Sequence, residues 1–279
     1  MKHLFAALAL IWLPAAASAQ PIVLLSNDDG YESEDLRQLA SALNEDFIVV
    51  IAAPRSNQSG SSSAIRGLGQ EADWSQFPFE GADIAYWIDA TPAISVHWGI
   101  DMVQRSYGRG PDLVISGINR GSNDGNAHLY SGTVGAARAA RAYGIPALAT
   151  SLERGETRDL EGAAEWINAF AGQLLEAEMD AYLNINFPLG DLDAQTPSVL
   201  TYPVDQRLEI FDRQARPLTV EVGMRSGRAS LWYRMSGEDQ GGDSDIAVLA
   251  RGQISVTPLA LEGFDAEQAE RLWNSEILD

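Results

Sequence analysis

Cysteine is absent from this 279-residue sequence, and lysine occurs once, at Lys2. Without cysteine the chain has no disulfide, no thiol nucleophile and no thiolate ligand for zinc or an iron–sulfur cluster. Lys2 lies in an N-terminal segment that we expect to be removed, as argued below. The remaining chain therefore has no Schiff-base lysine and no phosphate-binding lysine of the Walker type. The three histidines, His3, His97 and His128, do not form the H-E-x-x-H pattern of zinc hydrolases. Oxygen ligands would therefore have to hold any metal.

Basic residues are also scarce, since 19 Lys and Arg stand against 39 Asp and Glu and give a formal net charge of −20. Proteins that bind duplex nucleic acid present a basic face that displaces counterions from the phosphates. The charge balance argues against that class and favours a small substrate or a protein partner. The hydrophobic content of 46% is enough for a sizeable core, in one large domain or two smaller ones.

The first residues have the pattern of an export signal. A short basic start is followed by an uncharged run from Leu4 to Ala16 and by the small-residue triplet Ala17-Ser18-Ala19. The apolar run is shorter than the roughly 20 residues that a membrane-spanning helix needs. We therefore expect cleavage after Ala19, a periplasmic or secreted location, and no membrane-spanning segment in the mature chain.

Apolar runs alternate with amphipathic segments over the next 170 residues or so. Strands are expected at 22–26, 47–52, 84–89, 112–116, 147–150 and 182–186, and helices at 33–44, 92–104, 131–143 and 159–179. Strands that alternate with helices in this way predict a doubly wound α/β domain with a mostly parallel, Rossmann-like sheet.

The pattern changes after Pro188 to short β runs separated by Gly, Asp and Arg. These runs are expected at 201–207, 218–224, 231–235, 246–249 and 254–257, followed by an amphipathic helix at 265–277. They predict an arm of antiparallel hairpins with a closing helix. The chain is thus divided into a leader at 1–19, an α/β core at 20–190 and the arm at 191–279.

Polar loops follow the expected strands, and parallel sheets bind ligands at that edge. In the first of these loops, Asp28 and Asp29 would repel each other by about 4 kcal/mol at 4 Å and an effective dielectric near 20. A divalent cation such as Mg²⁺ removes that cost, and Ser59 and Asn119, from two other loops, can complete its coordination. The alternative is a simple Asn-Asp-Asp-Gly turn whose side chains bond their own backbone or cap the next helix.

A second polar segment, Tyr130 to Gly135, opens an expected helix. The unpaired N–H groups of a helix start and the small Gly132 suit a phosphate, although an ordinary Ser or Thr cap explains the segment alone equally well. The combination with the carboxylate pair favours phosphate chemistry. His128 precedes this helix and is a candidate proton donor, although a lone loop histidine is more often a surface residue.

Taken in order, these motifs resemble the SurE family of metal-dependent nucleotide phosphatases. The matching segments are Ile22 to Gly30, Ala53-Pro54 with Gln58-Ser59-Gly60, Ser116 to Asn119 with Gly121 and Asn123, Tyr130 to Ala136, Asn184 to Pro188, and Ser244-Asp245 through Leu259. The resemblance implies a phosphohydrolase for nucleoside 5′- and 3′-monophosphates that uses Mg²⁺ or Mn²⁺ and also acts on short polyphosphate. It further implies a homodimer or homotetramer joined through the arm and the closing helix.

The resemblance also assigns roles to residues. It implies that the metal is bound by Asp28, Asp29, Ser59 and Asn119, and that the phosphate site is lined by Asn123, Ser131, Gly132 and Thr133. The chain departs from the family pattern in the Tyr31–Asp35 segment, where a small-residue Pro-Gly turn is usual, at Ala93-Ile94-Ser95, where a more polar sequence is usual, and in its export signal.

Two mechanisms remain open at this point. A metal-bound water can attack in line with the leaving ribose oxygen, or Asp28 or Asp29 can act as a base or covalent nucleophile. The alternative function is an exported solute-binding protein that holds a phosphorylated molecule without catalysis, although such proteins usually have two lobes. A serine hydrolase is less favoured because the sequence has no G-x-S-x-G motif.

Overall fold

The computed structural model describes residues 20–67, 69–211, 232–237 and 241–261. The expected export signal at 1–19, the strand expected at 218–224 and the helix expected at 265–277 lie outside these residues. No helix in the described part of the chain is long and apolar enough to cross a membrane.

A nine-stranded sheet forms the centre of the protein. Its strands are β1 (Ile22–Ser26), β2 (Ile48–Pro54), β3 (Trp74–Gln76), β4 (Ile84–Ile88), β5 (Leu113–Arg120), β6 (Ala147–Leu152), β7 (Tyr182–Phe187), β8 (Ser198–Leu200) and β11 (Ile254–Pro258). Their order is β3-β4-β2-β1-β5-β6-β7-β11-β8. The pairs from β4 to β7 are parallel, whereas β3 and β11 pair in antiparallel orientation with β4 and β7. The predicted doubly wound, mostly parallel α/β fold is confirmed.

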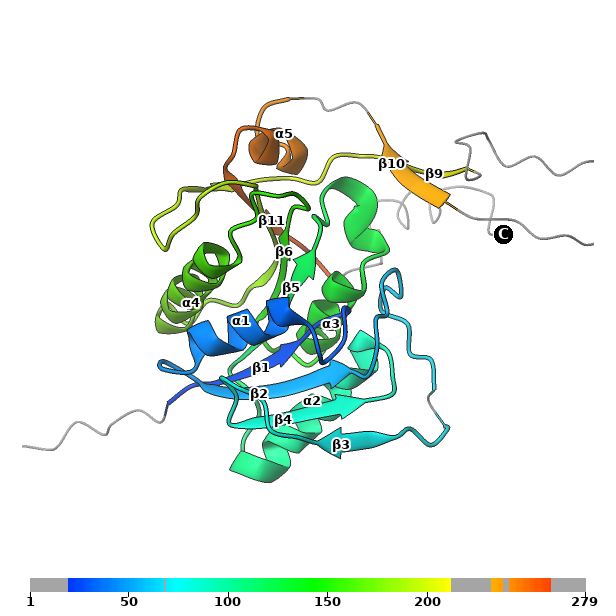
Figure 1. The fold of residues 1–279 in the computed structure, drawn as a ribbon, viewed down its shortest axis with the longest axis vertical. Coiled ribbons are helices and arrows are strands. Elements are labelled where there is room, and N and C mark those ends of the chain that lie inside the picture. Colours follow the sequence, from blue (N-terminus) through cyan, green and yellow to red (C-terminus); the bar gives the residue numbers. More distant parts are fainter. Residues whose placement is uncertain (1–19, 68, 212–231, 238–240, 262–279) are drawn as a thin grey trace, which may run out of the picture.

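Four helices cover the sheet in two layers. They are α1 (Glu34–Leu43), α2 (Pro92–Tyr107), α3 (Gly132–Arg141) and α4 (Leu160–Glu176). In Figure 1, α1 and α4 lie together over one face of the sheet, and α2 and α3 pack against each other on the opposite face. The six expected strands and four expected helices of this core are all present, with ends that differ by a few residues.

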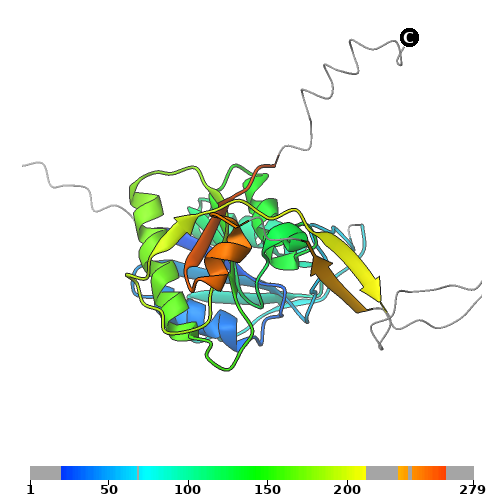
Figure 2. The ribbon, with the colours of Figure 1, turned by 90° about the horizontal axis from the view of Figure 1, so that it is seen from above.

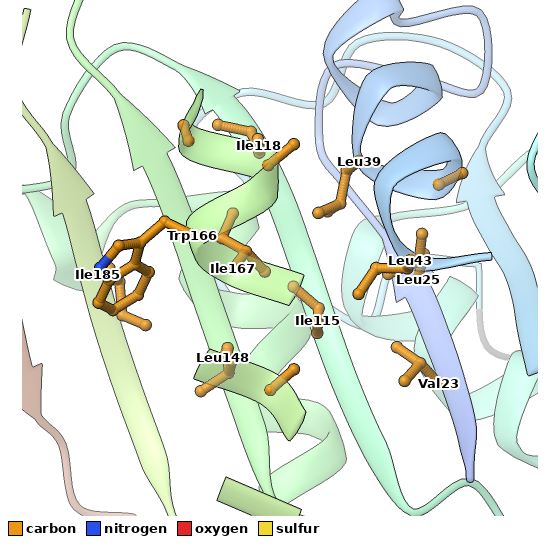
Figure 3. Close-up of a cluster of buried hydrophobic side chains, with 14 of the residues drawn as sticks. Val23, Leu25, Leu39, Leu43, Ile115, Ile118, Leu148, Trp166, Ile167 and Ile185 are labelled. Carbon is orange, nitrogen blue, oxygen red and sulfur yellow. The ribbon is translucent and has the colours of Figure 1, made fainter. Parts of the chain in front are cut away.

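The continuous apolar sequence of β1 is explained by this arrangement, because both faces of the strand are buried. Val23 and Leu25 belong to the cluster under α1 and α4, where Figure 3 shows Leu25 beside Leu43 of α1. Ile22 and Leu24 belong to the cluster on the other face. The strand is therefore held rigidly on both sides, and so is the start of the loop that follows it.

The part of the chain after residue 190 differs from the prediction in three places. The run at 246–249 is not a strand but part of the helix α5 (Asp245–Ala250), which Ser244 caps by accepting a hydrogen bond from Ala247 N–H at 3.1 Å. A four-residue apolar run fits a strand and a short helix equally well, so the cap decides.

The prediction of a strand at 201–207 is also wrong, since β8 ends at Leu200 and β9 begins only at Arg207. Thr201 N–H still donates to Val256 C=O at 2.9 Å, but Pro203 follows and has no N–H to continue the ladder. Finally, β8 and β11 join the main sheet. Of the described β runs in this region, only β9 (Arg207–Phe211) and β10 (Trp232–Ser236) form the separate antiparallel hairpin, which projects from the body in Figure 2.

The sheet changes direction at β1. The chain passes from β1 to β2 on one side, and later returns to place β5 on the other side of β1. Loops that leave two such neighbouring strands diverge, and they leave a crevice at the carboxyl ends of the strands. The loop with Asp28 and Asp29 and the end of β5 with Asn119 both lie at this point.

Candidate active site

Asp28 and Asp29 connect the loop after β1 to three other segments. Asp28 is 3% exposed, and its Oδ1 accepts a hydrogen bond from the Thr133 hydroxyl of α3 at 2.7 Å. Asp29 is half-buried; its Oδ1 accepts from Asn57 Nδ2 at 3.1 Å, and its Oδ2 accepts from the N–H of Arg120 at 3.3 Å. The two carboxylates are thus fixed by the start of α3, by the loop after β2 and by the end of β5.

Burial dominates the electrostatics of this pair. It raises the pKa of Asp28 to about 6, with a further increase from the charge of Asp29 that the Thr133 hydrogen bond opposes. Burial also raises the pKa of Asp29, against the hydrogen bond from Arg120. Within the described ranges neither carboxylate forms a salt bridge. The charges of Arg120 and Arg154 lower the pKa of Asp29 but do not cancel the effect of burial. Two adjacent carboxylates that are costly to ionise have the chemistry of a divalent-cation site.

Ser59 and Asn119 lie at the same edge. Strand β5 has one extra residue between Ser116 and Asn119 relative to β6, and such a bulge redirects the side chains that follow it. The Asn119 Nδ2 donates to Gly121 C=O at 2.7 Å, which leaves the amide oxygen for a cation. Ser59 is exposed, and its N–H is held by Asn57 Oδ1 at 3.0 Å. Among the described residues no three His, Asp or Glu side chains form a metal-binding group, so the hydroxyl and the amide would have to complete the coordination.

The start of α3 lies directly against Asp28. Ser131 is buried and caps the helix by accepting from Val134 N–H at 3.2 Å. A Cβ added at Gly132 would lie 2.8 Å from Asp28 Cβ and 2.9 Å from Asp28 Oδ2. Only glycine therefore allows this carboxylate and this helix start to come so close. The first turn of α3 contains no acidic residue, so its N–H groups and partial positive charge are available to an anion.

Asn123 lies in the cavity wall and is 8% exposed. Its backbone is held by two asparagines of β7, because its N–H donates to Asn186 Oδ1 at 2.7 Å and its C=O accepts from Asn184 Nδ2 at 2.9 Å. Its side-chain Nδ2 donates to Ser151 Oγ at 2.8 Å. No specific role was predicted for Asn184 and Asn186, and the structure places them as the support of Asn123.

These groups surround one cavity of about 620 Å³, a volume in the range of small-molecule sites. Asp28, Ser59, Asn119, Asn123 and Ser131 line it, whereas Asp29, Gly132 and Thr133 are not part of this lining. The predicted site residues are therefore brought together, and their roles as ligands stay a prediction.

Several residues that line the cavity had no predicted role. These are Arg120, Ser122, Asp124, Tyr130, Glu153, Arg154 and Met235. Burial raises the pKa of both Asp124 and Glu153. Arg154 Nε donates to Arg120 C=O at 2.7 Å, which fixes a guanidinium at the rim. Arg120, Ser122 and Tyr130 lie within or beside polar segments that the sequence marks, although no role was predicted for them, whereas Glu153, Arg154 and Met235 come from segments without a motif.

His128 is not among the residues that line the cavity. Its Nδ1 lies 2.6 Å from Gly125 C=O, so the ring is engaged with its own loop. Tyr31, in the segment that departs from the family pattern, packs edge-on against Phe77 with ring centroids 5.0 Å apart, and it does not line the cavity either.

The chain is similar to known proteins over most of its length. The family model described as "Survival protein SurE" matches residues 23–207. The chain is 36% identical over 244 residues to the 5'/3'-nucleotidase SurE of Edwardsiella ictaluri, which covers 86% of this chain and 90% of that protein. It is 32% identical over 268 residues to the 5'-nucleotidase SurE of Pseudoalteromonas atlantica, which covers 91% and 99%. The crystal structure of the SurE protein from Aquifex aeolicus matches with a TM-score of 0.71 and 27% identity, over 91% of this chain and 100% of that chain. The chain therefore belongs to the SurE family.

Proposed function

We propose that this protein is a metal-dependent phosphatase that removes phosphate from nucleoside 5′- and 3′-monophosphates. The observation that carries the proposal is the contact between the buried carboxylate of Asp28 and the start of α3, at the wall of one cavity. A cation and a phosphate can then share this edge of the sheet. The names of the relatives support the substrate class, since both are described as nucleotidases.

Asp28, Asp29, Ser59 and Asn119 would hold the cation, which we propose to be Mg²⁺ or Mn²⁺. When bound, such an ion neutralises phosphoryl charge and lowers the pKa of a coordinated water. Thr133 fixes Asp28 through Oδ1, and Asp28 Oδ2 faces the first turn of α3. Asp28 and Asp29 remain candidates for the base or the nucleophile in place of a coordinated water.

The phosphate would be held by the chain itself. The N–H groups at the start of α3, with Ser131 and Asn123, would bind the three equatorial phosphoryl oxygens, over which negative charge is spread in the transition state. Donors that are already fixed by the fold need no reorganisation during the reaction, and this is where most of the acceleration of phosphoryl transfer arises. Activity on short polyphosphate is part of the same proposal, since its terminal group presents the same oxygens.

The experiment that tests this function measures phosphate release from AMP, 3′-AMP and p-nitrophenyl phosphate by residues 20–279. Activity should disappear with EDTA and return with Mg²⁺ or Mn²⁺. Asp28→Asn should abolish it, whereas Asp101→Asn, which makes the same charge change at an exposed position of α2, should not. Phosphate binding without phosphate release in any metal would instead indicate a solute-binding protein.

We also propose that the protein is exported to the periplasm after cleavage behind Ala19, and that it assembles as a homodimer or homotetramer. The first proposal is supported by the sequence of residues 1–19, and the second by the projecting β9–β10 hairpin. Cell fractionation with N-terminal sequencing tests the location, and light scattering of the purified protein tests the assembly. Unprocessed protein in the cytosol, or a monomer at micromolar concentration, would contradict them.

A further inference from the structure

One segment of the chain connects Asn123 and Ser131, the two cavity residues proposed to bind the phosphate. Residues 124–130, which include the short 3₁₀ helix η1 (Gly125–Leu129), run from Asn123 to Ser131. Both of these residues line the cavity, and so do Asp124, Ala127 and Tyr130 between them. The position of this segment therefore sets the distance between the two groups proposed to hold the phosphate.

A distant carboxylate holds the segment from behind. Asp245, the first residue of α5, is fully buried and lies outside the cavity lining. Its Oδ2 accepts from Gly125 N–H at 2.6 Å, and its Oδ1 accepts from Val204 N–H at 3.2 Å and from its neighbour Ile246 at 2.9 Å. One side chain thus connects η1, the segment before the hairpin and α5.

Two further contacts join the same segments. Asn126 Nδ2 donates to Asp205 Oδ1 and to Gln206 C=O, each at 2.8 Å. A Cβ added at Gly125 would lie only 2.3 Å from Gln206 Oε1. The segment 204–206 leads directly into β9, and Met235 of its partner strand β10 lines the cavity. The base of the hairpin and the phosphate-binding segment are therefore packed as one unit.

We infer that Asp245 is a positioning residue, which holds Gly125 and thereby sets the geometry of the phosphate-binding segment 123–131 relative to the hairpin. It does not touch the substrate. The contact itself is independent of the reaction, whereas its effect on phosphate binding rests on the proposed function.

The chemistry of the contact requires a carboxylate. Asp245 receives three backbone N–H donors on two oxygens, and an ionised carboxylate offers acceptors on both. In Asp245→Asn one of those oxygens becomes an NH₂ group that faces a donor. A buried N–H then loses its partner, so the substitution should release the segment although it hardly changes the volume.

Hydrogen exchange of the mature protein, read by mass spectrometry, tests the contact directly. Amides of residues 124–131 should exchange at least about tenfold faster in Asp245→Asn than in the unchanged protein, because loss of this hydrogen bond favours local opening. The matched control is Asp243→Asn, an exposed carboxylate two residues earlier, which should leave these amides unchanged. Ser244→Ala should accelerate exchange only in α5, whose cap it removes. Unchanged exchange of 124–131 in Asp245→Asn would overturn the inference.

Binding measurements then separate positioning from general destabilisation. In Asp245→Asn, the KM for AMP and the inhibition constant of inorganic phosphate should rise about tenfold. The Kd of Mn²⁺ should stay within about twofold, since none of the proposed ligands contacts Asp245. A fall in melting temperature accompanied by equal losses in Mn²⁺ and phosphate affinity would show a merely structural role and overturn the inference.

A milder variant covers the case in which Asp245→Asn does not fold. Asn126→Ala removes the two contacts to Asp205 and Gln206 from a half-buried position, and should give the same pattern at about threefold. If the unchanged protein releases no phosphate from any ester, the proposed function fails, whereas the exchange experiment still decides the role of Asp245. Normal turnover with an unchanged KM and unchanged exchange in both variants would refute the positioning role alone.

Discussion

Two helices begin at the same edge of the sheet, and their first turns differ in charge. Helix α1 follows β1 and carries Glu34 and Asp35 in its first turn, and Ser33 before it makes no side-chain cap. Helix α3 follows β5, is capped by Ser131, and has no acidic residue in its first turn. The two helices have equal length, so the difference lies in the residues around their ends.

The first turn of α1 carries two acidic side chains of its own, which disfavour the binding of an anion there. Asp35 is 2% exposed and pairs with Arg158 and, at 3.6 Å, with Arg120. At α3 the carboxylate of Asp28 lies against the first turn of the helix, and it would share its charge with a cation. The start of α3 is therefore better suited to phosphate than the start of α1, because its own first turn is neutral.

The largest effect on this comparison is expected from Asp28→Asn, which removes one cation-binding carboxylate beside α3. We expect kcat/KM to fall at least about 10³-fold, because several kcal/mol of charge stabilisation depend on the cation. Steady-state kinetics with Mn²⁺ measure this fall. Activity within tenfold of the unchanged protein would show that Asp28 is not a ligand.

The same variant should stabilise the metal-free protein. Because the pKa of Asp28 is raised to about 6 in the folded state, ionised Asp28 destabilises the fold as pH rises from about 4 to above 6. The rise in the pKa of Asp28 from its ordinary value of 3.8 to about 6 corresponds to about 3 kcal/mol. In EDTA, Asp28→Asn should have a higher free energy of unfolding at pH 7.5 and no advantage at pH 4. If Asp28→Asn and the unchanged protein had the same free energy of unfolding at pH 7.5 as well as at pH 4, the burial of this charge would be contradicted.

Gly132→Ala should have the next largest effect, because its Cβ would push Asp28 away from the start of α3. Displacement of a reacting group by about 1 Å costs about 10²-fold in rate. The control is Gly172→Ala in α4, where a Cβ meets nothing within 4 Å, and which should gain up to about 1 kcal/mol of stability with unchanged kinetics. Equal kinetics in both variants would show that the close approach is not needed.

Ser131→Asp makes the first turn of α3 resemble that of α1. Aspartate is as good a cap as serine, so the melting temperature should change little. The added charge should raise the KM for AMP and the inhibition constant of phosphate about tenfold through repulsion. Phosphate titrations at two salt concentrations measure this effect. Unchanged phosphate affinity would place the anion elsewhere in the cavity.

The smallest expected effect is a difference in the free energy of unfolding between substitutions at Ser131 and at Ser33, the residues that precede α3 and α1. Ser131→Ala should lower the free energy of unfolding by about 1 kcal/mol because Val134 N–H loses its partner. Ser33→Ala should change it by less than about 0.5 kcal/mol, since Ser33 makes no cap hydrogen bond. Urea unfolding of the two variants decides the point, and equal losses would mean that the cap of α1 forms in solution.

The strands and helices of the α/β core were predictable because their signals are local. The apolar run of β1, the spacing of Leu36, Leu39 and Leu43, and the small residues of α3 each reflect the face that they bury. The helix at 246–249 was not predictable, because a run of four apolar residues is too short to show helical or strand periodicity. The cap hydrogen bond at Ser244 decided its structure.

The candidate site was predictable only where a motif marks it. Asp28, Ser59, Asn119 and Ser131 each follow a strand, and the topology of the sheet brings them together. Glu153 and Met235 reach the cavity through tertiary packing that no short pattern encodes. The contact between Gly125 and Asp245 spans 120 residues, and neither residue shows in the sequence that the other is its partner.

The central claim is that the carboxylate pair and the start of α3 form one site. Calorimetric titration of inorganic phosphate into the mature protein, with and without Mn²⁺, tests it most directly. Two ligands that share a site must change each other's affinity by the same factor. We predict that Mn²⁺ increases phosphate affinity at least about tenfold, and that Gly132→Ala removes this coupling. Phosphate that binds equally well with and without Mn²⁺ would contradict the claim, because the two ligands would then occupy independent sites.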